Sequence, residues 1–265
     1  MGKVQLAFDH TQNKNDIKEL SVVVYTDSFF YGLWDDDQTL VKVGYHPFNS
    51  LEGVLKLWDY YYSFKAVNIL SAIKPYVHLH EDDVDDIYFE AYFKGLYNLN
   101  RISKHIRKID GLDKQPISTL HYMNHKVTKR FDDHVVDYKA THISTAMANY
   151  CQNHNDEGLL CYVSNGKMHL TLSNAEGFRF YNQFDCYYDQ DYLYYLLLVM
   201  SEFNLDNQTY TVKIGGEIQR DSELYNLLNK HIKQLHFVDE KIKLTSQVSM
   251  NKSQFYDLYL CKTCV

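Results

Sequence analysis

The sequence predicts an α/β protein with mixed sheets, in which a three-stranded meander followed by a helix occurs twice. The clearer copy spans residues 158–203, where Asn165-Gly166 joins two apolar strands. This dipeptide is typical of a type I′ hairpin turn, because both central positions need a positive φ. A similar but looser pattern covers residues 20–62. These two copies make a duplicated fold the simplest expectation.

Composition supports a folded core and excludes some classes of function. Of the 265 residues, 45% are hydrophobic, and they include 24 Tyr and 14 Phe. Such a chain can bury a core and is not of the disordered type. The net charge of −7 disfavours general binding to nucleic acids or membrane surfaces, since both require a positive face.

The chain shows no sign of export or membrane insertion. Its first residues lack an apolar signal-peptide core, and its longest apolar run, residues 192–200, is too short to span a bilayer. The 5 cysteines are an odd number in a chain that needs no disulfide staples. We therefore expect a cytoplasmic protein with reduced thiols. Cys261 and Cys264 form a lone CxxC, which favours a tail with free thiols over a zinc site.

In the first half, continuous or alternating apolar residues predict three strands, at 20–25, 29–34 and 41–45. Ser50 can cap a helix whose apolar face includes Leu51, Val54, Leu55, Trp58 and Tyr62. Further strands are expected at 66–70 and 76–80. The acidic run 81–86 suits the start of a helix over 87–97.

Residues 101–130 are basic, with eight Lys or Arg against two Asp. A strand at 118–123 and a helix at 125–135 are expected there, followed by a strand at 140–143 and a helix at 144–151. This stretch is the best candidate for an anionic partner such as RNA, although a solvated face paired with the acidic residues 81–90 is the simpler interpretation. The candidate patch consists of Arg101, Lys104, Arg107, Lys108, Lys126, Lys129 and Arg130.

The second half has sharper patterns. Strands are expected at 159–163, 168–172 and 178–184, with Asn182 as a buried amide that needs partners. Asp189 can cap a helix over 192–203, and Asp221 a helix that includes Leu224 and Leu228. A strand at 211–214 separates these helices, and residues 255–261 form a closing strand or helix.

The order of strands and helices favours a specific architecture. Tyr25 and Phe48 bracket the first meander at almost the same separation as Tyr162 and Phe184 in the second. A βββαβα order implies an antiparallel meander extended by parallel strands. Ribonuclease-H-like domains have this order, and two in tandem form an actin-like ATPase fold. We expect the halves to be residues 1–151, with extra elements, and 152–265.

Several segments resemble one known family. These are 180–184 (FYNQF), 191–197 (DYLYYLL), 212–218 (VKIGGEI) and 222–225 (SELY), together with the closing segment 255–261. In them the chain resembles a Bacteroidetes family, domain-of-unknown-function family 3822. The resemblance implies an actin-like ATPase fold. It implies no activity.

An actin-like fold directs attention to three elements that hold nucleotide. Two hairpin turns, one in each half, grip phosphate through an Asp and through glycines that expose backbone N–H groups. The first turn offers Asp27 and Ser28 but then bulky Phe29, and the second offers Asn165 and Gly166 but no Asp. Gly215-Gly216 resembles the adenosine position, although a tight turn would also explain it. ATP with Mg²⁺ is thus a possible cofactor, and none is established.

Other constellations are weaker. His78, His80, Asp82 and Asp83 could hold a metal, but a polar strand end is the simpler interpretation, so no metal site is predicted. Asp35-Asp36-Asp37 fits an exposed turn. The first strand carries no acid for a two-metal nuclease, and no P-loop, dinucleotide-binding or kinase motif is present.

The leading hypothesis is a non-catalytic actin-like protein, a pseudo-ATPase that acts as a binding or scaffold module for a protein partner. Its motivation is a duplicated fold with altered phosphate turns. The first alternative is an ATP-binding protein or slow ATPase using the cleft between the halves. The second is an RNA-associated accessory protein using residues 101–130. No catalytic residues are predicted.

Overall fold

The first sheet has seven strands. The computed structural model describes residues 8–9, 16–50, 53–54, 56, 64–94, 105–133, 137–154, 157–238, 242–244 and 251–263. The strand order is β1-β4-β3-β2-β5-β9, with β15 beside β4. The strands are β1 (Phe8–Asp9), β2 (Ile17–Val24), β3 (Ser28–Asp35), β4 (Thr39–Pro47), β5 (Ala66–Ser71), β9 (Tyr138–His142) and β15 (Lys243–Leu244). β2, β3 and β4 form the predicted antiparallel meander, and β5 and β9 extend it in parallel.

The second sheet repeats this arrangement in the order β12-β11-β10-β13-β14. Its strands are β10 (Gly158–Ser164), β11 (Lys167–Asn174), β12 (Gly177–Asp185), β13 (Val212–Gly216) and β14 (Leu235–Phe237). Again the first three are antiparallel, while β13 and β14 run parallel to β10. The same order in both sheets confirms two ribonuclease-H-like units. The exact boundary between residues 151 and 152 stays a prediction.

A small third sheet lies between β5 and β9 in the chain. It consists of β6 (Tyr76–His80), β8 (Ile117–Asn124) and β7 (His105–Gly111), all antiparallel. The expected helix over 87–97 is wrong as far as residue 94. Three single-turn 3-10 helices stand there instead: η4 (Glu81–Asp83), η5 (Asp86–Tyr88) and η6 (Ala91–Phe93). Phe89 and Phe93 are fully buried against Leu120 and Tyr122, whereas Ile87 and Tyr88 are exposed, so this segment has no continuous buried apolar face.

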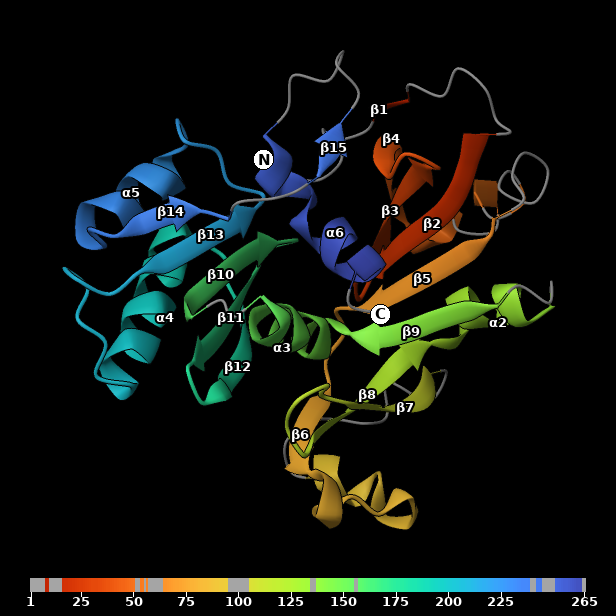
Figure 1. Cartoon of the computed structure of the whole chain (residues 1–265), viewed down its shortest axis with the longest axis horizontal. Helices are drawn as coiled ribbons and strands as arrows, with labels where there is room; N and C mark the ends of the chain where they lie inside the picture. Colours follow the sequence, from red (N-terminus) through yellow and green to blue (C-terminus); the bar gives the residue numbers. More distant parts are fainter. Residues whose placement is uncertain are drawn as a thin grey trace.

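Helices divide the molecule into layers (Figure 1). Between the two large sheets lie α3 (Ile143–Asn153) and α6 (Tyr256–Thr263), which contact each other and both sheets. α4 (Asp189–Glu202) and α5 (Glu223–His231) cover the outer face of the second sheet, and α2 (His125–Asp133) packs with β8. Two further 3-10 turns are η3 (Phe48–Ser50) and η8 (Lys252–Phe255). The inner core therefore joins the halves through α3 and α6.

Local signals explain most helix starts, with two corrections. The N-cap of α4 is Tyr188 rather than Asp189, and Asp191 accepts the backbone N–H groups of Tyr187 and Tyr188. The N-cap of α5 is Ser222 rather than Asp221, because the Ser222 hydroxyl accepts from Tyr225 N at 3.1 Å. In the helix expected after Ser50, residues 53, 54 and 56 are helical, and its other positions lie outside the described residues.

Candidate functional site

The first predicted phosphate turn joins β2 to β3. Tyr25 N donates to Ser28 O at 2.8 Å and closes the turn. The Ser28 hydroxyl donates to the exposed Asp27 carboxylate, also at 2.8 Å. Phe29, which was expected to crowd the turn, points into the outer core of the first sheet and stacks on His46 and Phe48. The bulk of Phe29 is therefore directed away from the space between the halves.

The second predicted turn joins β10 to β11 and has the expected hairpin geometry. Asn165 and Gly166 have φ values of 53° and 67°, as a type I′ turn requires. Asn165 N donates to Glu217 Oε1 at 3.0 Å. The Tyr45 hydroxyl of β4 lies 3.5 Å from Asn165 Oδ1. The turn is thus occupied by side chains from both halves.

The predicted adenosine glycines end β13 and are packed against protein. Gly216 has φ of 94°, and a Cβ there would lie 1.9 Å from Val163 O. A Cβ on Gly215 would lie 2.9 Å from Val238 Cγ2 and 3.3 Å from Ser253 O. The glycines let β13 approach β10 and η8 closely. The space beside them is filled by the chain itself.

Tyr45 and Glu217 bring these elements together, and neither residue was predicted. Tyr45 hydrogen-bonds Ser28 of the first turn and contacts Asn165 of the second. Burial, together with the carboxylates of Asp27 and Glu217, raises the pKa of its phenol. Glu217 follows the glycine pair and reaches the second turn. The structure therefore brings the predicted turn residues close together, but the side chains of Tyr45 and Glu217 occupy the space between them.

Beneath the turns lies a buried polar cluster that the sequence did not reveal. The fully buried Tyr25 donates from its hydroxyl to Asp257 Oδ2 at 2.6 Å and accepts from Ser164 Oγ at 2.7 Å. Tyr162 also hydrogen-bonds Asp257. Burial and the nearby Asp257 carboxylate hold the pKa of both tyrosines well above the usual value. This Tyr25–Tyr162–Asp257 cluster connects the turn after β2 with β10 and α6 across the middle of the molecule.

A cavity of about 450 Å³ opens beside the second turn, on the second half. Gly166 and Glu217 line it, together with the first residues of α4 and α5. Its carboxylates are those of Asp189, Glu217 and Glu223, and no Lys, Arg or His belongs to its described lining. Tyr187 and Tyr188 on its rim are 83% and 73% exposed, which is unusual for large aromatic side chains. The cavity therefore favours a ligand that is cationic, or that stacks on aromatic rings, over an anionic ligand.

A cluster of three histidines lies between the small sheet and α3: His121 and His142 are buried and His78 is half-buried. Ser144 Oγ contacts His142 Nδ1 at 2.7 Å and His78 Nε2 at 3.0 Å. His121 Nε2 lies 2.7 Å from Asp110. Burial lowers the pKa of His78 to about 4 and holds that of His142 well below 6.5. Burial alone would raise the pKa of Asp110, but His121 and two further hydrogen bonds lower it.

The predicted basic patch is only partly visible. Lys108 is half-buried on β7 and Lys129 is exposed on α2. Arg101 and Lys104 lie outside the described residues, and so do the side chains of the remaining members, Arg107, Lys126 and Arg130. The patch stays a prediction.

No group of three metal-ligating side chains gathers within the described ranges. His78 is half-buried and hydrogen-bonds Ser144, while His80 and Asp82 pair with each other at 3.5 Å on the surface. Cys261 is buried and its thiol points to the carbonyls of Val22 and Asn68; its CxxC partner Cys264 lies beyond the described residues. In the part of the chain that the structure describes, no helix is long and apolar enough to cross a membrane.

Comparison with solved structures defines the class as an actin-like ATPase fold. A protein of this fold and unknown function from Bacteroides thetaiotaomicron is 18% identical, with a TM-score of 0.74 over 97% of this chain and 99% of that one. A structure of the PilM-PilN type IV pilus biogenesis complex has a TM-score of 0.58 at 8% identity, over 93% of this chain and 98% of that one. The chain belongs to the family described as protein of unknown function (DUF3822), whose model matches residues 62–235. No curated protein matches.

Proposed function

We propose that this protein is a non-catalytic actin-like module, a pseudo-ATPase that binds a protein partner, with halves that meet near residues 151 and 152. The observation that carries the proposal is the hydrogen bond from Asn165 N to Glu217 Oε1. In an actin-like nucleotide site, backbone N–H groups of this turn would bind phosphate. Here an internal carboxylate takes that position.

Electrostatics add to this steric argument. Glu217 lies at the second turn, and Asp257 is buried between Tyr25 and Tyr162 just below. Two like charges 4 Å apart near a protein surface repel by about 4 kcal/mol. A triphosphate at the second turn would meet the Glu217 carboxylate, and the buried charge of Asp257 below it would add to the repulsion. Asp27 would remain to recruit Mg²⁺. Charge and packing together support loss of nucleotide binding.

The surface beside the turn supports a protein partner that presents basic side chains. Tyr187 and Tyr188 offer exposed rings, and the carboxylates of Asp189, Glu217 and Glu223 line the cavity between them and α5. Arginine and lysine stack on tyrosine faces and pair with carboxylates. A protein of the same fold occurs in the PilM-PilN complex, an example of an actin-like fold in an assembly. A cytoplasmic location with reduced thiols remains part of this proposal.

Calorimetry with Mg-ATP tests the proposal against the ATP-binding alternative. We expect no binding to the wild-type protein up to about 1 mM ATP. A functional site with a Kd of about 1 mM, a binding free energy of about −4 kcal/mol, would already be half filled at that concentration. Gly216→Trp is unsuitable as a control, because even a Cβ at Gly216 meets Val163 O. Asp27→Asn is suitable, because Asp27 is exposed. Sub-millimolar binding that Asp27→Asn weakens would overturn the proposal.

RNA binding is tested separately by filter retention at two salt concentrations. We expect no retention even at low salt, where contacts to phosphate are strongest. Retention at low salt that is lost at high salt, and lost in Lys108→Glu and Lys129→Glu variants, would favour the RNA-associated alternative.

A further inference from the structure

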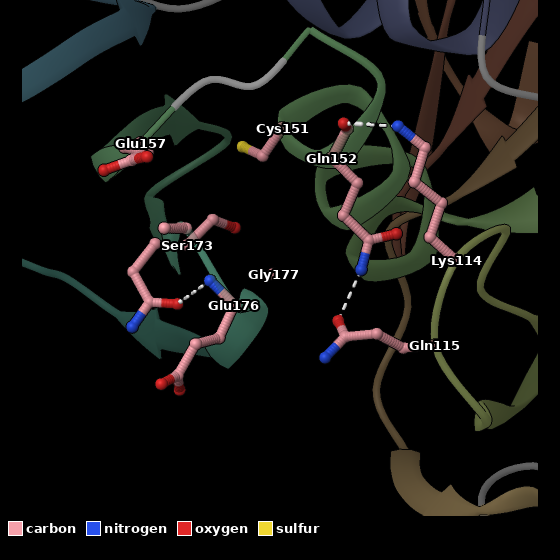
Figure 2. A pocket seen from close by; sticks show the side chains of 10 residues that line it. Lys114, Gln115, Cys151, Gln152, Glu157, Ser173, Glu176 and Gly177 are labelled. Atoms are coloured by element: carbon pink, nitrogen blue, oxygen red, sulfur yellow. Dashed lines mark hydrogen bonds between the residues drawn. The ribbon is translucent and has the colours of Figure 1, made fainter.

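A second cavity, of about 280 Å³, lies where the two halves meet (Figure 2). One wall comes from the β7–β8 loop and the end of α3, with Lys114, Gln115, Cys151 and Gln152. The other comes from Glu157 and the β11–β12 turn, residues 173–177. It is separate from the turns that would hold nucleotide and from the cavity beside Gly166. Any ligand in it would touch both halves.

The amide side chains of Gln115 and Gln152 form hydrogen bonds at the base of this cavity. Gln115 Oε1 accepts from Phe178 N at 2.8 Å, and Gln115 Nε2 donates to Phe178 O at 3.4 Å. Gln152 Nε2 donates to the same Gln115 oxygen (Figure 2). A Cβ on Gly177, which has φ of 111°, would lie 2.9 Å from Gln115 Cδ. The β11–β12 turn is therefore held against the first half by a specific contact that only glycine permits.

Two buried polar atoms of the lining have no hydrogen-bond partner. Ser173 is 2% exposed and its hydroxyl faces the cavity, while Gln152 is 7% exposed and its Oε1 is unpaired. Leaving such a group buried and unpaired costs free energy, so native structures satisfy nearly all of them. Both atoms can accept a hydrogen bond. They point to a ligand that donates.

The described lining of the cavity carries two carboxylates and one ammonium. Glu157 and Glu176 flank one side of the opening, and Arg179 pairs with Glu176 from outside the lining. The one ammonium, on Lys114, already donates to Gln152 O at 2.8 Å in the last turn of α3. A helix C-terminus adds partial negative charge, which this lysine offsets. Lys114 keeps its positive charge beside α3, and Glu157 places a negative charge on the opposite wall, where a cation is favoured.

We propose that this cavity binds a small organic cation with N–H donors, an amine or guanidinium. The ligand donates to Ser173 Oγ and Gln152 Oε1, and Glu157 balances its charge. Because one acceptor stands on α3 and the other on β11, binding holds α3 and the β11–β12 turn together. The site uses none of the groups that carry the proposed loss of nucleotide binding, so the two proposals stand or fall separately.

Titration calorimetry with agmatine, a small guanidinium and amine compound, tests the site on the full chain, with succinate as an anionic counterpart. We expect agmatine to bind and succinate not to bind. Ser173→Ala removes one hydrogen bond to a charged group and should weaken agmatine binding about 10- to 100-fold. Glu157→Gln should weaken it and reduce its dependence on salt.

Ser253→Ala is the matched control, because Ser253 is also buried with an unpaired hydroxyl but does not line the cavity. It should leave agmatine affinity unchanged. Neither serine variant should lower the melting temperature, since each removes a buried, unpaired polar group. Absence of agmatine binding, equal loss of affinity in both serine variants, or preferential binding of succinate would each overturn the proposal.

Discussion

Replacing Tyr25 by Phe tests how strongly the Tyr25–Tyr162–Asp257 cluster joins the halves. The change deletes a hydroxyl that bonds Asp257 at 2.6 Å and Ser164 at 2.7 Å, in a fully buried site. A hydrogen bond to a charged group contributes about 1.5–3 kcal/mol and one to a neutral group about 1 kcal/mol. Because Tyr162 still reaches Asp257, we expect a loss of about 3 kcal/mol in the free energy of unfolding rather than a larger value.

Urea denaturation at neutral pH measures this loss as a shift of the midpoint. Tyr194→Phe is the matched control, because the Tyr194 side chain is 62% exposed, and it should change stability by less than about 0.5 kcal/mol. Asp257→Asn in the Tyr25→Phe background should cost less than in the wild type, because the two groups interact directly. If Tyr25→Phe behaves like Tyr194→Phe, the cluster does not stabilise the contact between the halves and the reasoning is refuted.

Two further predictions concern backbone packing and pH. Gly216→Ala should lower the free energy of unfolding by more than about 4 kcal/mol, because the new Cβ meets Val163 O and the φ of this residue is positive. Gly111→Ala is the control, because a Cβ there meets no atom within 4 Å and should have little effect. Equal urea midpoints for the two variants would contradict this prediction. Burial lowers the pKa of His78 to about 4, so the unfolded chain binds more protons than the folded chain between that pH and 6.5. Stability should be full above about pH 6.5 and fall below it, by up to about 3 kcal/mol from His78, with a further loss from His142. His78→Gln should make the loss of stability below pH 6.5 smaller. His80→Gln is the control, because His80 is exposed, and it should leave that loss unchanged. A melting temperature that does not change between pH 7.5 and 5 would contradict the prediction.

The elements that the sequence predicted best are those whose signals are local. Asn165-Gly166 encodes a turn by backbone conformation alone, and the strands on either side of it pair as expected. The helix predicted over 87–97 is wrong as far as residue 94, because an acidic start and apolar spacing do not reveal whether a second surface exists to bury the apolar face. In the structure Phe89 and Phe93 are buried, but Ile87 is 86% and Tyr88 is 60% exposed.

The candidate site was predictable only in outline. Asp27, Asn165 and the glycines occupy turns, and turns can be found from sequence. Tyr45, Glu217 and Asp257 reach those turns from separate segments, so no spacing indicates them. The one local signal for Asp257 was an acidic residue within the aromatic closing segment 255–260, a position where a buried carboxylate requires a partner.

The position of α6 has a consequence for the order in which the protein can fold during synthesis. This helix covers β2 and β5, and its Lys262 reaches Glu19 at 3.5 Å and lies over the ring of Trp34. About 185 residues separate the end of β5 from the start of α6. At 5–20 residues per second, the ribosome would need roughly 10–40 s to supply them. Throughout that interval the inner face of the first sheet stays uncovered by its own helix, open to chaperones.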